Sequence, residues 1–182
     1  MAAVWETPSV VLISGIMAAG KSTVAELLAR RLPRAVHLRG DVFRRMIVTG
    51  RAAMTAQPDA QAWRQLRLRY DLAASAADRY AAAGFTVVLQ DVVLGAELPA
   101  MVDRIRHRPL AVVVLAPTAG VVAARERDRP KQGYGDWPVA DLDAAFRADT
   151  PRMGLWLDSS AQTPAETVDE IMARAWTAGR IG

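Results

Sequence analysis

Short apolar segments alternate with longer amphipathic segments along this chain of 182 residues. The apolar segments have the length of buried β-strands and predict strands at residues 10–14, 35–38, 85–90, 110–116 and 154–158. The segments between them carry apolar residues three and four positions apart, a spacing typical of helices. Helices are expected at residues 21–32, 41–49, 60–83, 98–106, 119–128, 139–148 and 164–178.

This alternation of strands and helices predicts an α/β fold with a parallel sheet, in a single domain over residues 1–182. Within it, residues 42–83 are expected to form a helical region on the substrate side, and residues 125–138 a lid. Asp41 stands at the start of one expected helix and is placed to cap it. Ligands of such folds bind at the carboxyl ends of the strands, so polar residues that follow strands are the candidates for chemistry.

A glycine-rich loop directly follows the first expected strand. Residues 15–23 read Gly-Ile-Met-Ala-Ala-Gly-Lys-Ser-Thr and match the phosphate-binding pattern G-x-x-x-x-G-K-[ST] in full. Glycines let backbone N–H groups wrap a phosphate chain, and the start of the following helix adds partial positive charge. We therefore expect this loop to bind ATP through Gly15, Ala18, Ala19, Gly20, Lys21, Ser22 and Thr23.

Two side chains of the loop have expected chemical roles. Lys21 is one of two lysines among 23 basic residues, the other being Lys131, and its compact charge suits the β- and γ-phosphates. We assign Lys21 as a catalytic residue and the hydroxyl of Ser22 as a ligand of Mg²⁺. The alternative is an ordinary turn between a strand and a helix. It is disfavoured because the loop matches the phosphate-binding pattern in full and is preceded by an apolar strand and followed by an amphipathic helix.

Two aspartates follow expected strands and should project near the loop. Phosphate transfer to an alcohol needs Mg²⁺ and commonly a carboxylate that takes the hydroxyl proton. We assign Asp41 as proton acceptor or anchor of the substrate hydroxyl, and Asp91 as a contributor to the Mg²⁺ shell and the substrate site; the two roles could be exchanged. The alternative for Asp41 is a helix N-cap, and the alternative for Asp91 is an acidic residue in an ordinary turn. Arg44, one helical turn after Asp41, is expected to hold substrate or phosphate unless it is solvated.

Residues 125–135 are rich in arginine and glycine. Such a segment suits a lid that closes over the triphosphate and stabilises charge on the transferred group. Arg125 and Arg129, four positions apart, would share a helix face and are assigned as catalytic residues. A solvated helix end, neutralised locally by Glu126 and Asp128, is the alternative.

Composition narrows the class of protein. The chain is 52% hydrophobic and 23% charged, contains no cysteine, and has no apolar run long enough to cross a bilayer. Residues 1–8 carry no basic residue and do not read as a secretory signal, so a cytoplasmic location is expected, without a membrane partner. The pI of about 10.1 reflects arginine usage, whereas the net charge is only +4. That charge disfavours nucleic acid as a partner and fits an enzyme that handles phosphate; the expected partner is a small-molecule hydroxyl acceptor, and the oligomeric state stays open.

Several of these motifs together resemble the nucleoside-monophosphate-kinase-like group of P-loop kinases. They are the loop at 15–23, Gly40-Asp41-x-x-Arg44, the arginine-rich segment and Asp158-Ser159-Ser160. Within this group, residues 91–95 and 125–128 are similar to chloramphenicol phosphotransferase-like proteins, whereas residues 16–19 and 44–46 depart from that pattern. The resemblance implies a five-stranded parallel sheet in the order 2-3-1-4-5, a mobile lid, a catalytic aspartate at Asp41, and lid arginines at 125 and 129.

Three functions are compatible with these features. The leading hypothesis is an enzyme that transfers the γ-phosphate of ATP, with Mg²⁺, to a hydroxyl of a small molecule. A kinase of nucleotides, nucleosides or polynucleotide 5′-hydroxyl ends is the second, motivated by Arg44 and the basic segment 60–70. A non-catalytic protein that changes state on nucleotide binding is the third.

Overall fold

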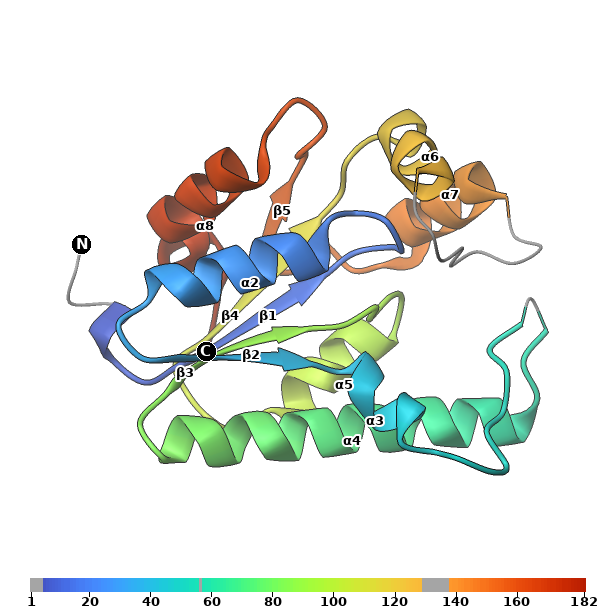
Figure 1. The fold of residues 1–182 in the computed structure, drawn as a ribbon, viewed down its shortest axis with the longest axis horizontal. Coiled ribbons are helices and arrows are strands. Elements are labelled where there is room, and N and C mark those ends of the chain that lie inside the picture. The colour runs from blue at the N-terminus through green and yellow to red at the C-terminus, as the bar shows by residue number, and fades with distance from the viewer. Residues whose placement is uncertain (1–4, 56, 129–137) are drawn as a thin grey trace.

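The centre of the protein is a parallel sheet (Figure 1), seen in a computed structural model that describes residues 5–55, 57–128 and 138–182. Its five main strands lie in the order β2-β3-β1-β4-β5, and each neighbouring pair is parallel. The strands are β1 (Val10–Ser14), β2 (Ala35–Arg39), β3 (Thr86–Gln90), β4 (Leu110–Leu115) and β5 (Leu155–Leu157). The predicted fold class and strand order are therefore confirmed.

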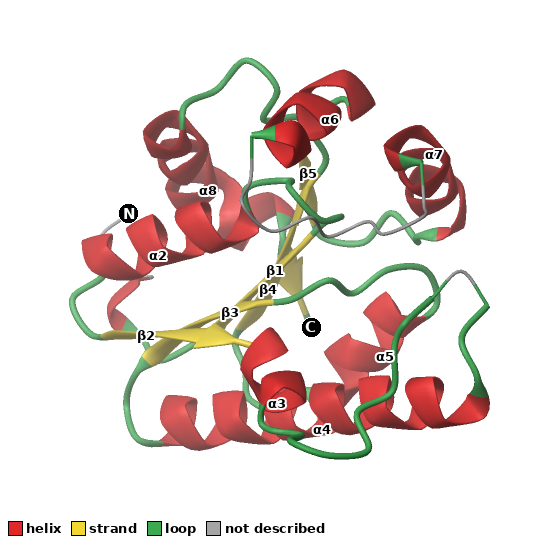
Figure 2. Ribbon diagram, turned by 45° about the vertical axis from the view of Figure 1, so that its right-hand side comes forward, coloured by secondary structure: helices red, strands yellow, loops and turns green. Residues whose placement is uncertain are grey.

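Helices cover both faces of this sheet (Figures 1 and 2). One face carries α2 (Lys21–Arg31) and α8 (Pro164–Ala178), and the other carries α4 (Ala60–Ala82) and α5 (Glu97–Arg104). The remaining helices are α3 (Asp41–Arg45), which follows β2, and α6 (Ala119–Arg127) and α7 (Val139–Asp149), which separate β4 from β5. Within the described ranges, no helix is long and apolar enough to cross a bilayer.

Burial explains the continuous apolar runs of the central strands. Every residue of β1, β3 and β4 is buried, because helices cover the sheet from both sides. The edge strand β2 is only partly buried along its length. A short sixth strand, β6 (Arg180–Ile181), pairs antiparallel with β4; a strand of two residues carries no periodicity and was not predicted.

The helix predicted at residues 41–49 is shorter than expected. It ends at Arg45. The apolar side chains beyond it are not packed against the protein, as Met46 is 66% and Val48 91% exposed, so burial does not stabilise a longer helix. The prediction that Asp41 caps this helix is wrong: Gly40 holds the cap position, and Asp41 is the first helical residue. The Asp41 side chain is consequently available for other contacts.

Tyr70 anchors α4 to the segment that follows β3. Its side chain is 2% exposed, and its hydroxyl donates a hydrogen bond to the carbonyl oxygen of Val92 at 2.7 Å. Burial raises the pKa of Tyr70 to about 12, because the phenolate would lose its hydration. The phenol therefore stays protonated and keeps this hydrogen bond at neutral pH.

We expect Tyr70→Phe to lower the free energy of unfolding by about 1–2 kcal/mol, because the partly buried hydrogen bond to the carbonyl of Val92 loses its donor. Urea denaturation of the purified protein measures this change. Tyr80→Phe is the matched control, since Tyr80 is an exposed tyrosine on the same helix and its change should stay within about 0.5 kcal/mol. Equal stability of the two variants would contradict the anchor role.

Candidate functional site

The loop between β1 and α2 contains backbone angles that glycine adopts more easily than other residues. Gly15 and Gly20 have φ of +140° and +97°, a region that favours glycine. Ala18 also has a positive φ, of +58°, which is rare for a residue with a Cβ. A Cβ at Gly15 would lie 2.4 Å from the carbonyl oxygen of Leu115, so no other residue fits there without a backbone shift.

The N-terminus of α2 points its first N–H groups toward the loop. Gly20 is the N-cap residue, and no side chain of the described residues forms a cap hydrogen bond there. Uncapped N–H groups and the helix dipole attract an anion, so this end of the helix suits a phosphate group. The predicted phosphate-binding residues 15–23 thus lie together in one loop and the first turn of α2.

Lys21 lies within this loop, and its side chain is buried. Its ammonium group donates hydrogen bonds to the carbonyl oxygens of Gly15 at 2.8 Å and Ile16 at 2.7 Å. These contacts hold the positive charge inside the curve of the loop. A phosphate chain bound by the loop would therefore meet a charge that is already in position.

Ser22 contacts the end of the neighbouring strand β3. Its hydroxyl donates to the side-chain oxygen of Gln90 at 3.4 Å, and Gln90 is buried beside Ile13 of β1. Oxygen atoms are the ligands that Mg²⁺ prefers, so these two side chains fit a magnesium ion at the phosphate chain. Sequence reasoning assigns Asp91, the next residue, to the Mg²⁺ shell and misses Gln90. The register of β3 against β1, which places Gln90 opposite Ile13, identifies Gln90 as a candidate.

Asp91 is held by an arginine from α4. Arg69 Nε donates to Asp91 Oδ2 at 2.9 Å, and Arg69 Nη2 donates to Oδ1, which also accepts from the N–H of Val92 at 2.7 Å. Both carboxylate oxygens thus already accept from the guanidinium. The role of Asp91 in the Mg²⁺ shell and the substrate site stays a prediction. For that role, one carboxylate oxygen of Asp91 would have to give up its hydrogen bond with Arg69.

Asp41 lies at the end of β2, next to this pair. The Asp41 side chain is half-exposed and pairs with Arg45 and, at 3.5 Å, with Arg39. Arg44 points elsewhere: its guanidinium donates to the carbonyl oxygen of Ala52 at 3.0 Å. Arg44 therefore braces the segment that leads to α4, and its predicted contact with substrate or phosphate remains untested.

Arg125 reaches the phosphate-binding loop from α6. Its Nη1 donates to the carbonyl oxygen of Ala19 at 3.3 Å, and its Nη2 to that of Ser159 at 3.4 Å. Arg125 therefore joins the loop to the segment after β5, over the place where a nucleotide would bind. The other predicted lid arginine, Arg129, lies outside the described residues.

The segment after β5 is itself ordered by short polar contacts. Ser160 donates from its backbone N–H and its hydroxyl to Asp158, and the hydroxyl contact in particular lowers the pKa of the Asp158 carboxyl. The Ser160 oxygen also accepts from the N–H of Thr118 at 2.7 Å. These bonds fix the loops after β4 and β5 side by side at the carboxyl edge of the sheet.

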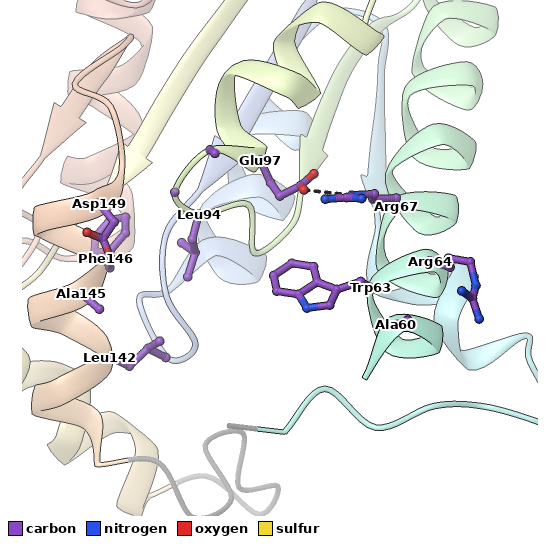
Figure 3. Close-up of a pocket in the computed structure, with 12 residues that line it drawn as sticks. Ala60, Trp63, Arg64, Arg67, Leu94, Glu97, Leu142, Ala145, Phe146 and Asp149 are labelled. Atoms are coloured by element: carbon purple, nitrogen blue, oxygen red, sulfur yellow. Dashed lines mark hydrogen bonds and ion pairs between the residues drawn. The ribbon is translucent and has the colours of Figure 1, made fainter. Parts of the chain in front are cut away.

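A cavity of about 720 Å³ opens between α4, α5 and α7 (Figure 3). Trp63 extends its indole ring from α4 toward Leu94, and α7 contributes Leu142 and Phe146 to the opposite wall. Arg67 Nε donates to Glu97 Oε1 at 3.1 Å, whereas Arg64 points away from the cavity. The size fits a drug-sized ligand.

Ser14 connects this cavity with the phosphate-binding loop. Its hydroxyl donates to the carbonyl oxygen of Val93 at 2.6 Å and accepts from the Val93 N–H at 3.2 Å. Gly15 follows Ser14 in the loop, and Leu94 follows Val93 in the cavity wall. The Ser14–Val93 hydrogen bonds therefore join the segment that starts the phosphate-binding loop to the segment that leads into the cavity wall.

Arg147 is a further residue that sequence reasoning missed. Its Nη2 donates to the carbonyl oxygens of Ala116 at 3.0 Å and Pro117 at 2.7 Å, and its Nε donates to Asp143 at 2.8 Å. These bonds attach α7, one wall of the cavity, to the end of β4. The sequence offers one indication of this role, because Asp143 and Arg147 are four positions apart and therefore share one face of the helix.

Comparison with known proteins agrees with this geometry. A profile of the AAA domain family (AAA_33) matches residues 10–150, and a search of curated proteins found no match. Similar solved structures include the Mycobacterium tuberculosis APS kinase CysC in complex with AMPPNP and APS, at TM-score 0.69 and 19% identity over 92% of this chain and 96% of that chain.

Two other kinases have similar structures. A sugar kinase from Janibacter sp. HTCC2649 has a TM-score of 0.66 and 20% identity over 92% of this chain and 93% of that chain. A gluconokinase from Sinorhizobium meliloti 1021 has a TM-score of 0.61 and 21% identity over 92% and 91% of the two chains. At these identities the likeness shows the fold alone, which this chain shares with these kinases.

We expect Gly15→Ala to weaken Mg·ATP binding by at least about tenfold and to lower the free energy of unfolding by about 2 kcal/mol, because the methyl group forces the loop away from Leu115. Calorimetry and urea denaturation measure the two effects. Gly120→Ala in α6 is the control, since a Cβ there meets no atom within 4 Å; it should leave nucleotide affinity unchanged and raise the free energy of unfolding by at most about 1 kcal/mol. Unchanged nucleotide affinity in Gly15→Ala would show that the loop conformation is not needed.

Proposed function

Because this chain belongs to the AAA domain family AAA_33, we propose that it is an ATP-dependent phosphotransferase, which moves the γ-phosphate of Mg·ATP to a hydroxyl group of a small molecule. The observation that carries the proposal is the junction between the phosphate-binding loop and the cavity. Ser14 and Val93 hold the two together through paired hydrogen bonds. An acceptor in the cavity would consequently lie beside the terminal phosphate.

The loop and Lys21 would bind the triphosphate. Backbone N–H groups of residues 15–23 and the start of α2 supply donors, and the Lys21 ammonium supplies the charge. A Mg²⁺ ion held by Ser22, with Gln90 beside it, would neutralise charge on the phosphate oxygens. Arg125 would cover the nucleotide from α6, and the catalytic role of Arg129 stays a prediction.

Asp41 would act as the proton acceptor of the transfer. The acceptor oxygen forms a bond to the γ-phosphorus, the bond from that phosphorus to the β–γ bridging oxygen breaks, and ADP leaves. The hydroxyl proton passes to the Asp41 carboxylate. Asp41 suits this role because its side chain is half-exposed at the carboxyl edge of the sheet and is not used as a helix cap.

The cavity favours an uncharged acceptor with an apolar ring. Its apolar walls are formed by Trp63, Leu94, Leu142 and Phe146. Among its charged lining residues, Arg67 is already paired with Glu97, Arg64 points away, and Asp149 carries a negative charge. An anionic acceptor would have to break that pair to find a counter-charge. Chloramphenicol, an uncharged alcohol with an aromatic ring, belongs to the favoured class, in line with the resemblance to chloramphenicol phosphotransferase-like proteins.

Nucleotides are the second candidate acceptors. Trp63 offers a ring for a base. Arg64 follows it on α4 but points away from the cavity, so its guanidinium would have to turn to reach a phosphate bound there. The pairing of Arg67 with Glu97 leaves less positive charge for a phosphate than the sequence of this segment suggests. Mononucleotides and oligonucleotides with 5′-hydroxyl ends therefore belong in the acceptor screen as competing outcomes.

We expect Asp41→Asn to reduce phosphate transfer by at least about 100-fold, because general-base catalysis is lost, while Mg·ATP binds with unchanged affinity. Radioactive γ-labelled ATP offered with chloramphenicol, aromatic alcohols, gluconate, shikimate and the nucleotide acceptors measures transfer, and calorimetry measures binding. Asp103→Asn, an exposed aspartate on α5, is the control.

Two outcomes would count against the proposed function. An Asp41→Asn variant with full transfer would remove Asp41 from the reaction. Mg·ATP binding by the wild-type protein without transfer to any acceptor class would instead favour a non-catalytic nucleotide-dependent binding protein.

A further inference from the structure

A buried ion pair lies beside the candidate active site, and the proposed reaction does not use it. The side chain of Arg69 is 12% exposed and that of Asp91 is 1% exposed. Two hydrogen bonds join them, one from Nε at 2.9 Å and one from Nη2. A guanidinium that meets a carboxylate through two parallel bonds fixes both position and orientation of the groups.

Gly40 packs directly against this pair. A Cβ at Gly40 would lie 1.9 Å from Asp91 Oδ2 and 2.5 Å from Asp91 Cγ, so only glycine allows the carboxylate to stay where it is. The N–H of Gly40 also donates to the carbonyl oxygen of Gln90 at 3.0 Å. The backbone at the end of β2 is therefore held between the end of β3 and the Asp91 carboxylate.

The next residue is Asp41, the first residue of α3. This helix has five residues and none of them is buried, so α3 cannot hold Asp41 by its own packing. Burial lowers the pKa of Arg69, and the negative charge of Asp41 acts in the opposite direction, so the Asp41 carboxylate is within electrostatic reach of the Arg69 guanidinium. Arg45 of the same helix pairs with the Asp41 carboxylate, but the backbone of this short helix has no buried residue to fix it and is joined to the sheet through Gly40.

We propose that Arg69, through its ion pair with Asp91, is a positioning residue that holds Gly40 and thereby the carboxylate of Asp41 in place for the transfer. This inference rests on the proposed function. Arg69 does not touch the reacting atoms; it acts through Asp91 and the backbone of Gly40. Because an error of about 1 Å in the place of a reacting group can cost about 100-fold in rate, loss of this support affects the chemical step.

The first test compares Arg69→Met, Arg69→Lys and Arg79→Met in transfer from ATP to the acceptor found by the screen. Arg69→Met should lower kcat by about 10- to 100-fold and leave the KM for ATP and the calorimetric affinity for Mg·ATP within about twofold. Arg69→Lys should recover part of kcat, since it keeps the charge but not the two-pronged contact. Arg79→Met, an exposed arginine on the same helix, should behave as wild type.

A second test reaches the same contact from the other side. Gly40→Ala should lower kcat as Arg69→Met does, because the added methyl group collides with the Asp91 carboxylate. In an Asp91→Ala background that carboxylate is absent, so the further loss on adding Gly40→Ala should fall to less than about threefold. Such non-additivity is expected only when the two residues act through one contact.

The outcomes separate this inference from the proposed function. A folded Arg69→Met protein with wild-type kcat, or one in which kcat and Mg·ATP affinity fall together, overturns the positioning role while the kinase function stands. The positioning role is also overturned if the decrease in kcat of the Gly40→Ala, Asp91→Ala double variant equals the product of the decreases in the two single variants. A wild-type protein that fails to bind Mg·ATP overturns the proposed function, and this inference with it.

Discussion

The close approach of Gly15 to the end of β4 is the constraint on which the rest of the site depends. The absence of a Cβ at Gly15 lets the loop leave β1 against the carbonyl oxygen of Leu115 and turn back over Lys21. A similar constraint acts on the other side of β1, where Gly40 lets β2 end against Asp91. Because both contacts lie at the carboxyl edge of the sheet, the sheet itself sets the distance between the phosphate-binding loop and Asp41.

Arginine is the second organising element, because three partly buried arginines join separate elements of the fold. Arg147 attaches α7 to the end of β4, Arg125 attaches α6 to the phosphate-binding loop, and Arg69 fixes Asp91. A guanidinium suits this role because it can donate several hydrogen bonds in a fixed plane and stays charged when partly buried.

The strands, the helices and the phosphate-binding loop could be predicted because each is local in sequence, whereas the strand order was implied by the family resemblance. Apolar runs mark the strands, and the loop pattern lies within nine consecutive residues. The contact of Ser22 with Gln90, the pairing of Arg69 with Asp91 and the cavity across α4 and α7 join residues far apart in the chain, so no local pattern contains them. The error at Asp41 has a related cause: a cap and a first helical residue differ by one position, and only the backbone of Gly40 distinguishes them.

Energetics argues that the Arg69–Asp91 pair is there for geometry rather than stability. Removing both charges from water costs about as much as their attraction returns, so a buried ion pair adds little to the free energy of unfolding compared with apolar residues of the same size. A leucine and a valine could fill such a space, but they could not fix a glycine backbone by a directed contact. The chain instead places this ion pair against Gly40, the residue before the carboxylate that we propose as proton acceptor, where orientation matters most.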